Sequence, residues 1–131
     1  MDQYLYVLRN AFRVSGRDTR KQFWMFTLFY IIFTIVAVLI DAFVFGVDVT
    51  SETQSTTGPA QWLVLLVHIV PSITTGVRRL HDRDWRGWWV LIALVPLIGA
   101  IILIVLYCLK GTSGPNRFGE DPYGANPNTF A

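Results

Sequence analysis

Three long apolar runs constrain this chain more than any other feature. They cover residues 23–45, 60–77 and 88–109. A helix of 23 residues, rising about 1.5 Å per residue, is roughly 35 Å long and can cross a hydrocarbon core of about 30 Å. The second run, with 18 residues, is near the lower limit for a span, and the third has 22. The sequence therefore predicts an all-α integral membrane protein with three transmembrane helices.

The composition supports a membrane location. Of the 131 residues, 53% are hydrophobic and 15% are charged, whereas a soluble domain has about 25% charged residues. The charges lie in short blocks between the apolar runs, as a bilayer requires. These features argue against the alternative, a soluble bundle of buried helices. The net charge of +2 gives no indication of nucleic-acid binding, and the single cysteine, Cys108, excludes an intrachain disulfide.

The first apolar run is predicted to be a retained anchor rather than a cleaved signal peptide. It is longer than a signal-peptide core, and no small-residue cleavage pattern follows it before Asp48. The polar tail, residues 110–131, is rich in Gly, Pro and Asn, which favour turns. We therefore expect one membrane domain over residues 1–131.

Residues 2–14 are predicted to form an amphipathic helix, because apolar residues recur there at helical spacing. Such a helix can lie in the membrane interface or pack on the rest of the protein. Ser15 and Gly16 are expected to end it. Thr19 and Gln22 then form the pattern of a capping box just before the first span.

Prolines interrupt the second and third apolar runs. Pro71 is expected to kink the second span. Pro96 and Gly99 are expected to kink the third. A re-entrant hairpin over residues 88–109 is the alternative, but halves of about ten residues are too short to cross the bilayer twice.

The distribution of Lys and Arg predicts the orientation. Five precede the first span, none lies in the loop of residues 46–59, four lie in the loop of residues 78–87, and two are in the tail. The positive-inside rule then places the N-terminus in the cytoplasm. With three spans, the tail would be outside.

The loop of residues 78–87 holds the main candidate site, because arginines and acidic residues are crowded there before a pair of tryptophans. Arginine binds phosphate bidentately, and tryptophan prefers the headgroup region. A second basic cluster precedes the first span. The candidate residues for binding an anionic lipid or a partner are Arg17, Arg20, Arg78, Arg79, His81, Asp82, Arg83, Trp85, Arg86, Trp88 and Trp89.

The competing interpretation of these residues is topological anchoring. Asp82 or Asp84 would then pair with Arg17 or Arg20 and tie the first two spans together. A catalytic reading is weak, because His81 and Asp82 are adjacent and would point about 100° apart on a helix. We predict no catalytic residue, no metal site and no cofactor.

Two ionisable residues, Asp41 and His68, lie within the predicted spans or near their ends. Such residues are expensive in lipid and often functional. They support one rival function, an oligomeric channel or transporter. A second rival is an immunity or regulatory factor that binds a membrane-acting toxin or another membrane protein, either through its spans or through the loop of residues 48–58.

Several ordered motifs together resemble one family. They are YLYVLRN (4–10), SGRDTRKQFW (15–24), Pro71, RRLHD (78–82), GWW (87–89), PLIG (96–99) and KGTSGPNRFGEDP (110–122). The chain resembles the bacterial inner-membrane family known as domain of unknown function 805 (DUF805).

The resemblance implies a multispan inner-membrane protein and supplies no reaction. A tail motif around Asn116, Arg117, Phe118 and Asp121 belongs to the pattern, and we interpret it as a structured turn that closes the tail onto the bundle. The predicted function is that of a non-enzymatic membrane protein with a cytoplasmic Arg/Trp surface. Its candidate partners are anionic phospholipid, a membrane protein or a second copy of the chain.

Overall fold

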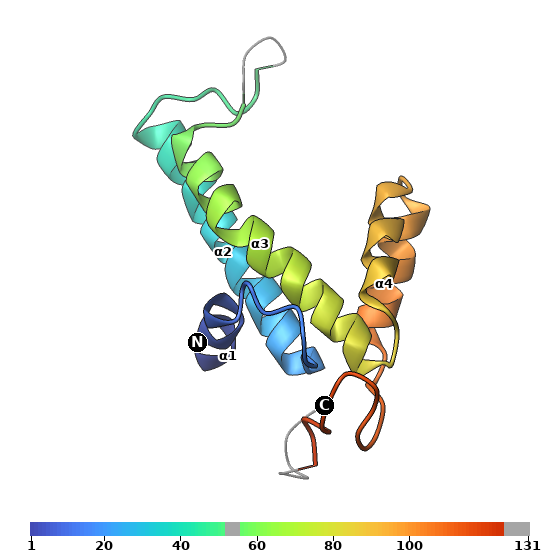
Figure 1. Cartoon of the computed structure of the whole chain (residues 1–131). Coiled ribbons are helices and arrows are strands. Elements are labelled where there is room, and N and C mark those ends of the chain that lie inside the picture. The colour runs from blue at the N-terminus through green and yellow to red at the C-terminus, as the bar shows by residue number, and fades with distance from the viewer. Residues whose placement is uncertain (52–55, 125–131) are drawn as a thin grey trace.

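The computed structural model describes residues 1–51 and 56–124, and it is helical throughout, with no β-strand in the described part of the chain. Figure 1 shows a long antiparallel pair of helices, with a short helix across it and a hairpin beside it. The elements in chain order are α1 (Asp2–Arg9), α2 (Arg20–Phe43), α3 (Pro59–Asp82), the 3-10 helix η1 (Gly87–Leu94) and α4 (Ile98–Cys108).

The long helices α2 and α3 form the framework. Each has 24 residues, or roughly 36 Å at the usual rise. Among the described residues, these two helices alone are long and apolar enough to cross a membrane. The predicted capping box is confirmed, since Thr19 Oγ1 accepts from the Gln22 amide and Gln22 Oε1 accepts from the Thr19 amide. The kink predicted at Pro71 stays a prediction.

The N-terminal helix is shorter than the predicted 2–14. α1 ends at Arg9, and the Asn10 side chain donates a hydrogen bond of 2.8 Å to the Tyr6 carbonyl oxygen. An Asn that bonds to the backbone in this way competes with continuation of the helix. The packing alternative is confirmed: buried Tyr4 and Val7 lie against Phe26 of α2.

The third apolar run does not form the single kinked helix that we predicted. It is divided into η1 and α4, which pack against each other as a hairpin. At about 2.0 Å per residue for a 3-10 helix and 1.5 Å for an α-helix, each arm is roughly 16 Å long, or about half of a hydrocarbon core. The hairpin is therefore too short to cross, and the structure has two candidate spans in place of the predicted three.

The turn of the hairpin has identifiable local causes. Pro96 cannot donate a backbone hydrogen bond and disfavours helical geometry in the residue before it. Leu97 adopts a positive φ of 63°. A Cβ on Gly99 would lie 1.7 Å from the Ile92 carbonyl oxygen, so only glycine lets the two arms approach this closely.

The tail returns to the end of the molecule where α2 begins and α3 ends. Arg20 and Arg83 donate to the carbonyl oxygens of Cys108 and Lys110, at the end of the hairpin. The tail therefore lies at the same end of the α2–α3 pair as the N-terminal segment. The expectation that the two are on opposite sides depended on a third long helix, and the hairpin instead brings both ends of the third apolar run to this end.

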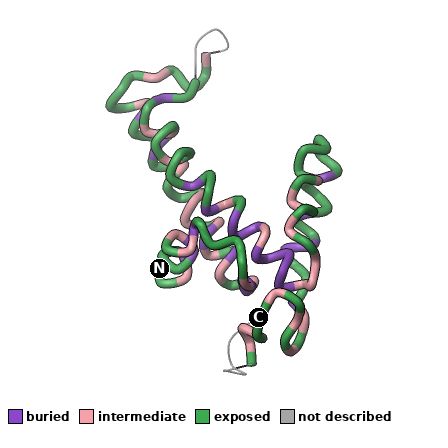
Figure 2. Tube along the Cα trace, viewed as in Figure 1, coloured by how far each residue is buried: buried purple, intermediate pink, exposed green. Residues whose placement is uncertain are grey.

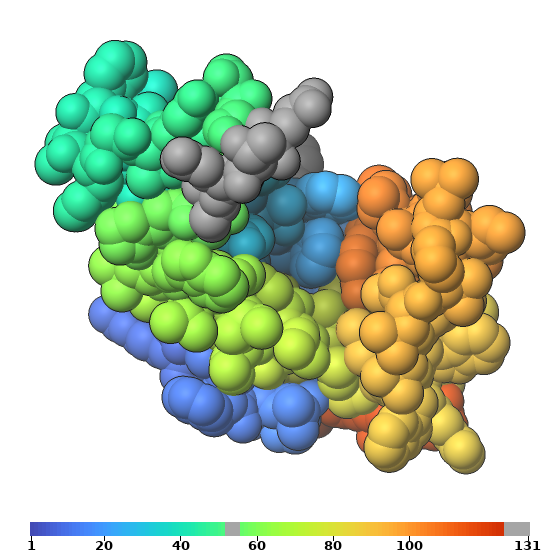
Figure 3. Space-filling view, turned by 90° about the horizontal axis from the view of Figure 1, so that it is seen from above, coloured from blue at the N-terminus to red at the C-terminus, as the bar shows by residue number. Residues whose placement is uncertain are grey.

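Burial is concentrated at this same end, which we call the polar end. Figure 2 shows buried residues along the C-terminal half of α3, whereas the other end of the α2–α3 pair is largely exposed. One apolar cluster joins the start of α2 to the end of α3 and to α4, through Phe23, Leu80, Leu103 and Tyr107. Viewed from above in Figure 3, the hairpin stands beside the long helices.

Candidate functional site

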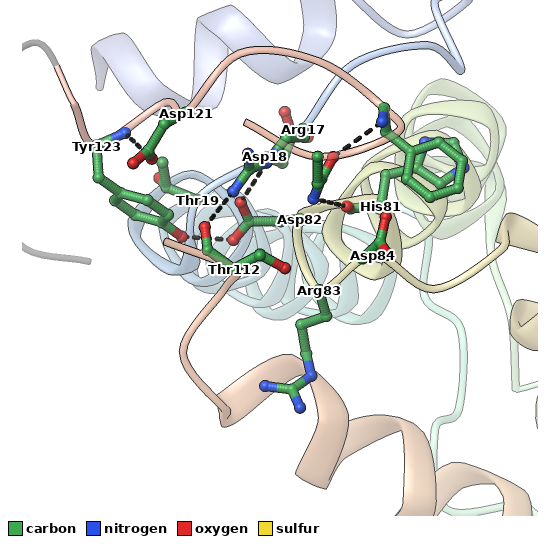
Figure 4. A network of polar contacts seen from close by, with 12 residues as sticks. Arg17, Asp18, Thr19, His81, Asp82, Arg83, Asp84, Thr112, Asp121 and Tyr123 are labelled. Atoms are coloured by element: carbon green, nitrogen blue, oxygen red, sulfur yellow. Dashed lines mark hydrogen bonds and ion pairs between the residues drawn. The ribbon is translucent and has the colours of Figure 1, made fainter. Parts of the chain in front are cut away.

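The polar end is organised around the buried carboxylate of Asp82, the last residue of α3. Arg17 Nε lies 3.0 Å from Asp82 Oδ1, and Arg79 Nη1 pairs with the other oxygen. Tyr123 of the tail donates its hydroxyl to Asp82 Oδ2. Figure 4 shows how three segments far apart in sequence meet at this one carboxylate. Of the pairings expected from the sequence, Asp82 or Asp84 with Arg17 or Arg20, the structure forms Asp82 with Arg17, whereas Asp84 pairs with Arg117.

A second buried pair stands beside the first. Arg78 Nη2 lies 2.6 Å from Asp18 Oδ1, and Thr75 donates its hydroxyl to Asp18 Oδ2 at 2.7 Å. Burial raises the pKa of Asp18, and the Arg78 charge and the Thr75 hydrogen bond partly oppose that rise. Arg78 also donates to the Tyr6 hydroxyl of α1. The Arg78–Asp18 pair therefore ties α1 and the segment before α2 to the C-terminal part of α3.

Backbone carbonyl groups of the tail and of the end of α4 accept hydrogen bonds from Arg17 and Arg79. Arg17 donates to the oxygens of Thr112 and Gly114 at 2.6 and 2.7 Å. Arg79 donates to the carbonyl oxygens of Tyr107 and Leu109. Buried charges are stable only when paired and hydrogen-bonded. The tail thus completes the hydrogen bonding of Arg17, and the C-terminal end of α4 completes that of Arg79.

Close packing fixes the start of the tail. A Cβ on Gly111 would lie 1.9 Å from Asp82 Oδ2, so no other residue fits there without a shift. Thr112 donates its amide to the Asp82 carbonyl oxygen at 2.7 Å. The chain therefore passes directly over the end of α3.

The tail motif forms the structured turn that the sequence predicted. Asn116 donates to the His81 carbonyl oxygen at 2.9 Å, and the Phe118 ring stacks on the His81 ring with centroids 4.0 Å apart. Arg117 pairs with Asp84 at 3.0 Å, in an exposed position. Asp121 accepts from the amides of Gly114 and Tyr123, and these bonds lower its pKa.

Burial divides the predicted site residues into two groups. Arg17, Arg78, Arg79, His81 and Asp82 are buried in the contacts described above. Arg86, Trp88 and Trp89 are exposed, and Trp88 keeps 78% of its surface. Arg20, Arg83 and Trp85 are intermediate. The buried group ties the fold together, and only the exposed group is free to meet a ligand.

The exposed group lines a shallow cavity of about 320 Å³. Its walls are Arg86, Trp88, Trp89 and Ile92. Within the described residues, the Arg86 guanidinium makes no hydrogen bond or ion pair. Trp85 packs edge-on against Trp89 at 4.9 Å. The cavity therefore presents the unpaired, planar guanidinium of Arg86 beside the amphipathic indole rings of Trp88 and Trp89.

Asp41 and His68 each have partners of their own. Asp41 accepts from the amides of Ala60 and Gln61 at 2.9 Å, which caps the start of α3. His68 Nε2 lies 2.8 Å from the Tyr4 hydroxyl, and its Nδ1 lies 2.7 Å from the Val64 carbonyl oxygen. Both groups hold helices in place.

Sequence reasoning missed the partners that come from distant segments. Asp18 and Thr75 are 57 residues apart, and Tyr123 and Asp82 are 41 apart. The sequence held one signal for these contacts: Asp18 lies inside the basic cluster of residues 16–21, and an acidic residue that becomes buried needs a cation as its partner.

Part of the loop of residues 48–58, the candidate toxin-binding segment, lies outside the described residues. In the described chain, no three His, Cys, Asp or Glu residues come together as metal ligands.

Comparison with known proteins places this architecture in a family. Inner membrane protein YhaI of Escherichia coli (strain K12) is 40% identical over 129 residues, covering 96% of this chain and 100% of that protein. Inner membrane protein YhaH of the same strain is 43% identical over 122 residues, covering 93% and 97%. No solved structure gives a significant match. The family model described as protein of unknown function (DUF805) matches residues 11–120, from the end of the N-terminal helix to the tail motif, and the chain belongs to this family.

Proposed function

We propose that this chain is a non-enzymatic protein of the bacterial inner membrane that binds anionic phospholipid headgroups at its polar end. In this proposal α2 and α3 span the bilayer, and the hairpin enters it from the cytoplasmic side. The observation that carries the proposal is the free Arg86 guanidinium beside exposed Trp88 and Trp89. Arginine binds phosphate oxygens bidentately, and tryptophan prefers the headgroup depth.

The charge distribution supports the orientation. Once the tail is placed at the polar end, all eleven Lys and Arg residues belong to segments that meet there, whereas the sequence between α2 and α3 contains none. An excess of Lys and Arg marks the cytoplasmic side of a membrane protein. Cytoplasmic leaflets rich in anionic lipid attract such a surface.

The apolar exterior supports the membrane position. Large side chains such as Ile31, Ile35, Leu63 and Leu66 lie exposed along α2 and α3, although they would be buried in a soluble bundle. An exposed apolar surface of this size is normally covered by lipid or by another protein. The relatives named above are inner membrane proteins, which favours lipid. Exposed Phe12 and Val14, just after α1, fit an interfacial depth at the polar end.

The test is native mass spectrometry of the full chain in mild detergent with added phosphatidylglycerol or phosphatidylcholine. Arg86→Gln should reduce the preference for phosphatidylglycerol by about tenfold, since it removes a charge-assisted bond to phosphate. Arg9→Gln is the matched control, because Arg9 is an exposed arginine outside the cavity. An unchanged preference in Arg86→Gln, or an equal loss in both variants, would refute a specific site at Arg86.

Substitution of Arg78 and Arg79 is not a suitable test of lipid binding. Both side chains are buried and paired with Asp18 and Asp82. Removing them leaves buried carboxylates uncompensated. A loss of bound lipid in such a variant would report a loss of the fold.

A further inference from the structure

A second cavity shares Trp88 with the cavity at Arg86. It has a volume of about 480 Å³, within the usual range of about 300–1,000 Å³ for ligand pockets. Its walls are almost entirely apolar, and His81 is the one ionisable side chain among them. The apolar lining residues are Val14, Val77, Trp88, Val90 and Leu91.

Three elements build this cavity. Val77 comes from the last turns of α3, Val90 and Leu91 come from η1, and Val14 comes from the segment after α1. Gly87 keeps η1 against α3, since a Cβ there would lie 2.7 Å from Val77 Cγ1. The cavity thus exists because the hairpin begins directly beside the end of α3.

The two cavities are continuous in their lining. Trp88 belongs to both, and Arg86 of the first is joined through Gly87 to the second. One is bordered by a free guanidinium, and the other is apolar and borders segments that we place in the membrane. This pairing of a cation with an adjacent apolar slot matches one kind of molecule, an amphiphile with an anionic head and a hydrocarbon tail.

We infer that the apolar cavity holds an acyl chain of the same phospholipid whose phosphate binds Arg86. This inference rests on the proposed function and deepens it, because the ligand becomes a whole diacyl phospholipid with one ordered chain. Lipid tails are as apolar as the cavity walls, so burial by itself gives little preference for the cavity over the bilayer. Packing of the chain against the walls holds it, and the measurable consequence is loss of chain motion.

The test uses the full chain reconstituted in phosphatidylcholine vesicles, with phosphatidylglycerol spin-labelled near the end of one chain. Electron paramagnetic resonance then measures the fraction of label that is motionally restricted. The wild-type protein should restrict labelled phosphatidylglycerol more than labelled phosphatidylcholine. Leu91→Trp and Val14→Trp each place a large ring at the cavity wall, and each should lower the restricted fraction by about half or more because the ring takes up volume that the acyl chain would occupy.

Leu94→Trp is the matched control. Leu94 is an exposed leucine on the same helix as Leu91 and does not line the cavity. Val14 and Leu91 are themselves 57% and 51% exposed, so neither substitution disturbs the core, and circular dichroism can verify the helix content. An unchanged restricted fraction in both Leu91→Trp and Val14→Trp, or an equal fall in Leu94→Trp, would overturn the acyl-chain site.

The two proposals fail in different ways. Arg86→Gln should abolish the difference between the two headgroups in the same assay. If the headgroup difference survives in Arg86→Gln, the proposed function is wrong, and the assignment of an anionic lipid to the cavity falls with it. If Arg86→Gln abolishes the difference while the tryptophan variants change nothing, the headgroup site stands and the chain site is refuted.

Discussion

The two ends of the α2–α3 pair are built in different ways. At the polar end, Asp18 and Asp82 are enclosed by arginines, by the N-terminal segment and by the tail. At the other end a single carboxylate, Asp41, caps α3, and the connecting segment has no Lys or Arg. One carboxylate is enough to cap α3 where two helices are joined by a loop, whereas the hairpin and the tail are held at the polar end by a network with contributions from several segments.

The largest expected effect comes from removing the central carboxylate. Asp82→Ala leaves Arg17 and Arg79 buried without their anion, which should cost about 3–5 kcal/mol of stability. Thermal unfolding in detergent, followed by circular dichroism, measures the loss. Asp84→Asn, two residues away, breaks an exposed pair and keeps a side chain that tolerates the positive φ of 62° at this position, so it should cost at most about 1 kcal/mol. Equal losses of stability in the two variants would show that the buried Asp82 network contributes no more to the polar end than an exposed ion pair does.

The next effect should come from the start of the tail. Gly111→Ala places a methyl group against the Asp82 carboxylate and should cost about 1–3 kcal/mol while releasing the tail. Limited proteolysis after Lys110 or Arg117 would detect the release. Gly124→Ala is the control, because its added Cβ meets neighbours no closer than 3.5 Å. A tail that stays protected in Gly111→Ala would show that Asp82 does not fix the chain above it.

A smaller and more local effect is expected at the other end. Asp41→Ala removes the acceptor for the amides of Ala60 and Gln61, so hydrogen exchange in the first turn of α3 should be about tenfold faster. The tail should keep its protection. Asp48→Ala, in the exposed loop at the same end, should leave α3 unchanged. Loosening of the tail in Asp41→Ala would mean that the two ends are coupled.

The smallest effect is a pH dependence of tail docking. The amides of Tyr123 and Gly114 lower the pKa of Asp121, so its ionised form stabilises the docked tail. That contribution is complete above the ordinary carboxyl pKa of about 3.9 and is lost as the pH falls through the lower folded value. Hydrogen exchange of the tail between pH 5 and pH 2 would follow the loss, with Asp121→Asn as the control. A tail equally docked in wild type and Asp121→Asn at about pH 5 would contradict this role.

The sequence was most informative where one segment determines its own structure. The capping box at Thr19 and the two long helices follow from local spacing and apolar length. A pairing between an acidic residue of the 78–87 loop and an arginine before the first span was also expected, because opposite charges crowded on one side attract each other, but the choice of Asp82 and Arg17 came from the structure. These features depend on residue type and periodicity, which a single sequence displays.

The sequence offered the hairpin only as the alternative to a single kinked span, and it could not decide between them because the cause of the hairpin is tertiary. A run of 22 apolar residues has the hydropathy of a span whether it crosses or turns back. Pro96 and Gly99 indicate a break, but its size depends on the approach of Gly99 to Ile92 and on anchoring of both ends near α3. For the same reason the sequence could not show which arginines of the 78–87 loop are buried and which are exposed. Arg79 is buried and Arg86 is exposed, although the two residues are of the same type and lie in the same loop.

The Asp82 network also has a consequence for biosynthesis. The ribosome makes Arg17 first, Asp82 follows 65 residues later, and the carbonyl groups of Thr112 and Gly114 follow about thirty residues after that. A chain that stops short of residue 112 would leave Arg17 paired with Asp82 but without the carbonyl acceptors of Thr112 and Gly114. The tail is translated after Arg17 and Asp82 and thus completes the polar end, so a protease that samples loose polar segments would distinguish chains with a docked tail from chains without one.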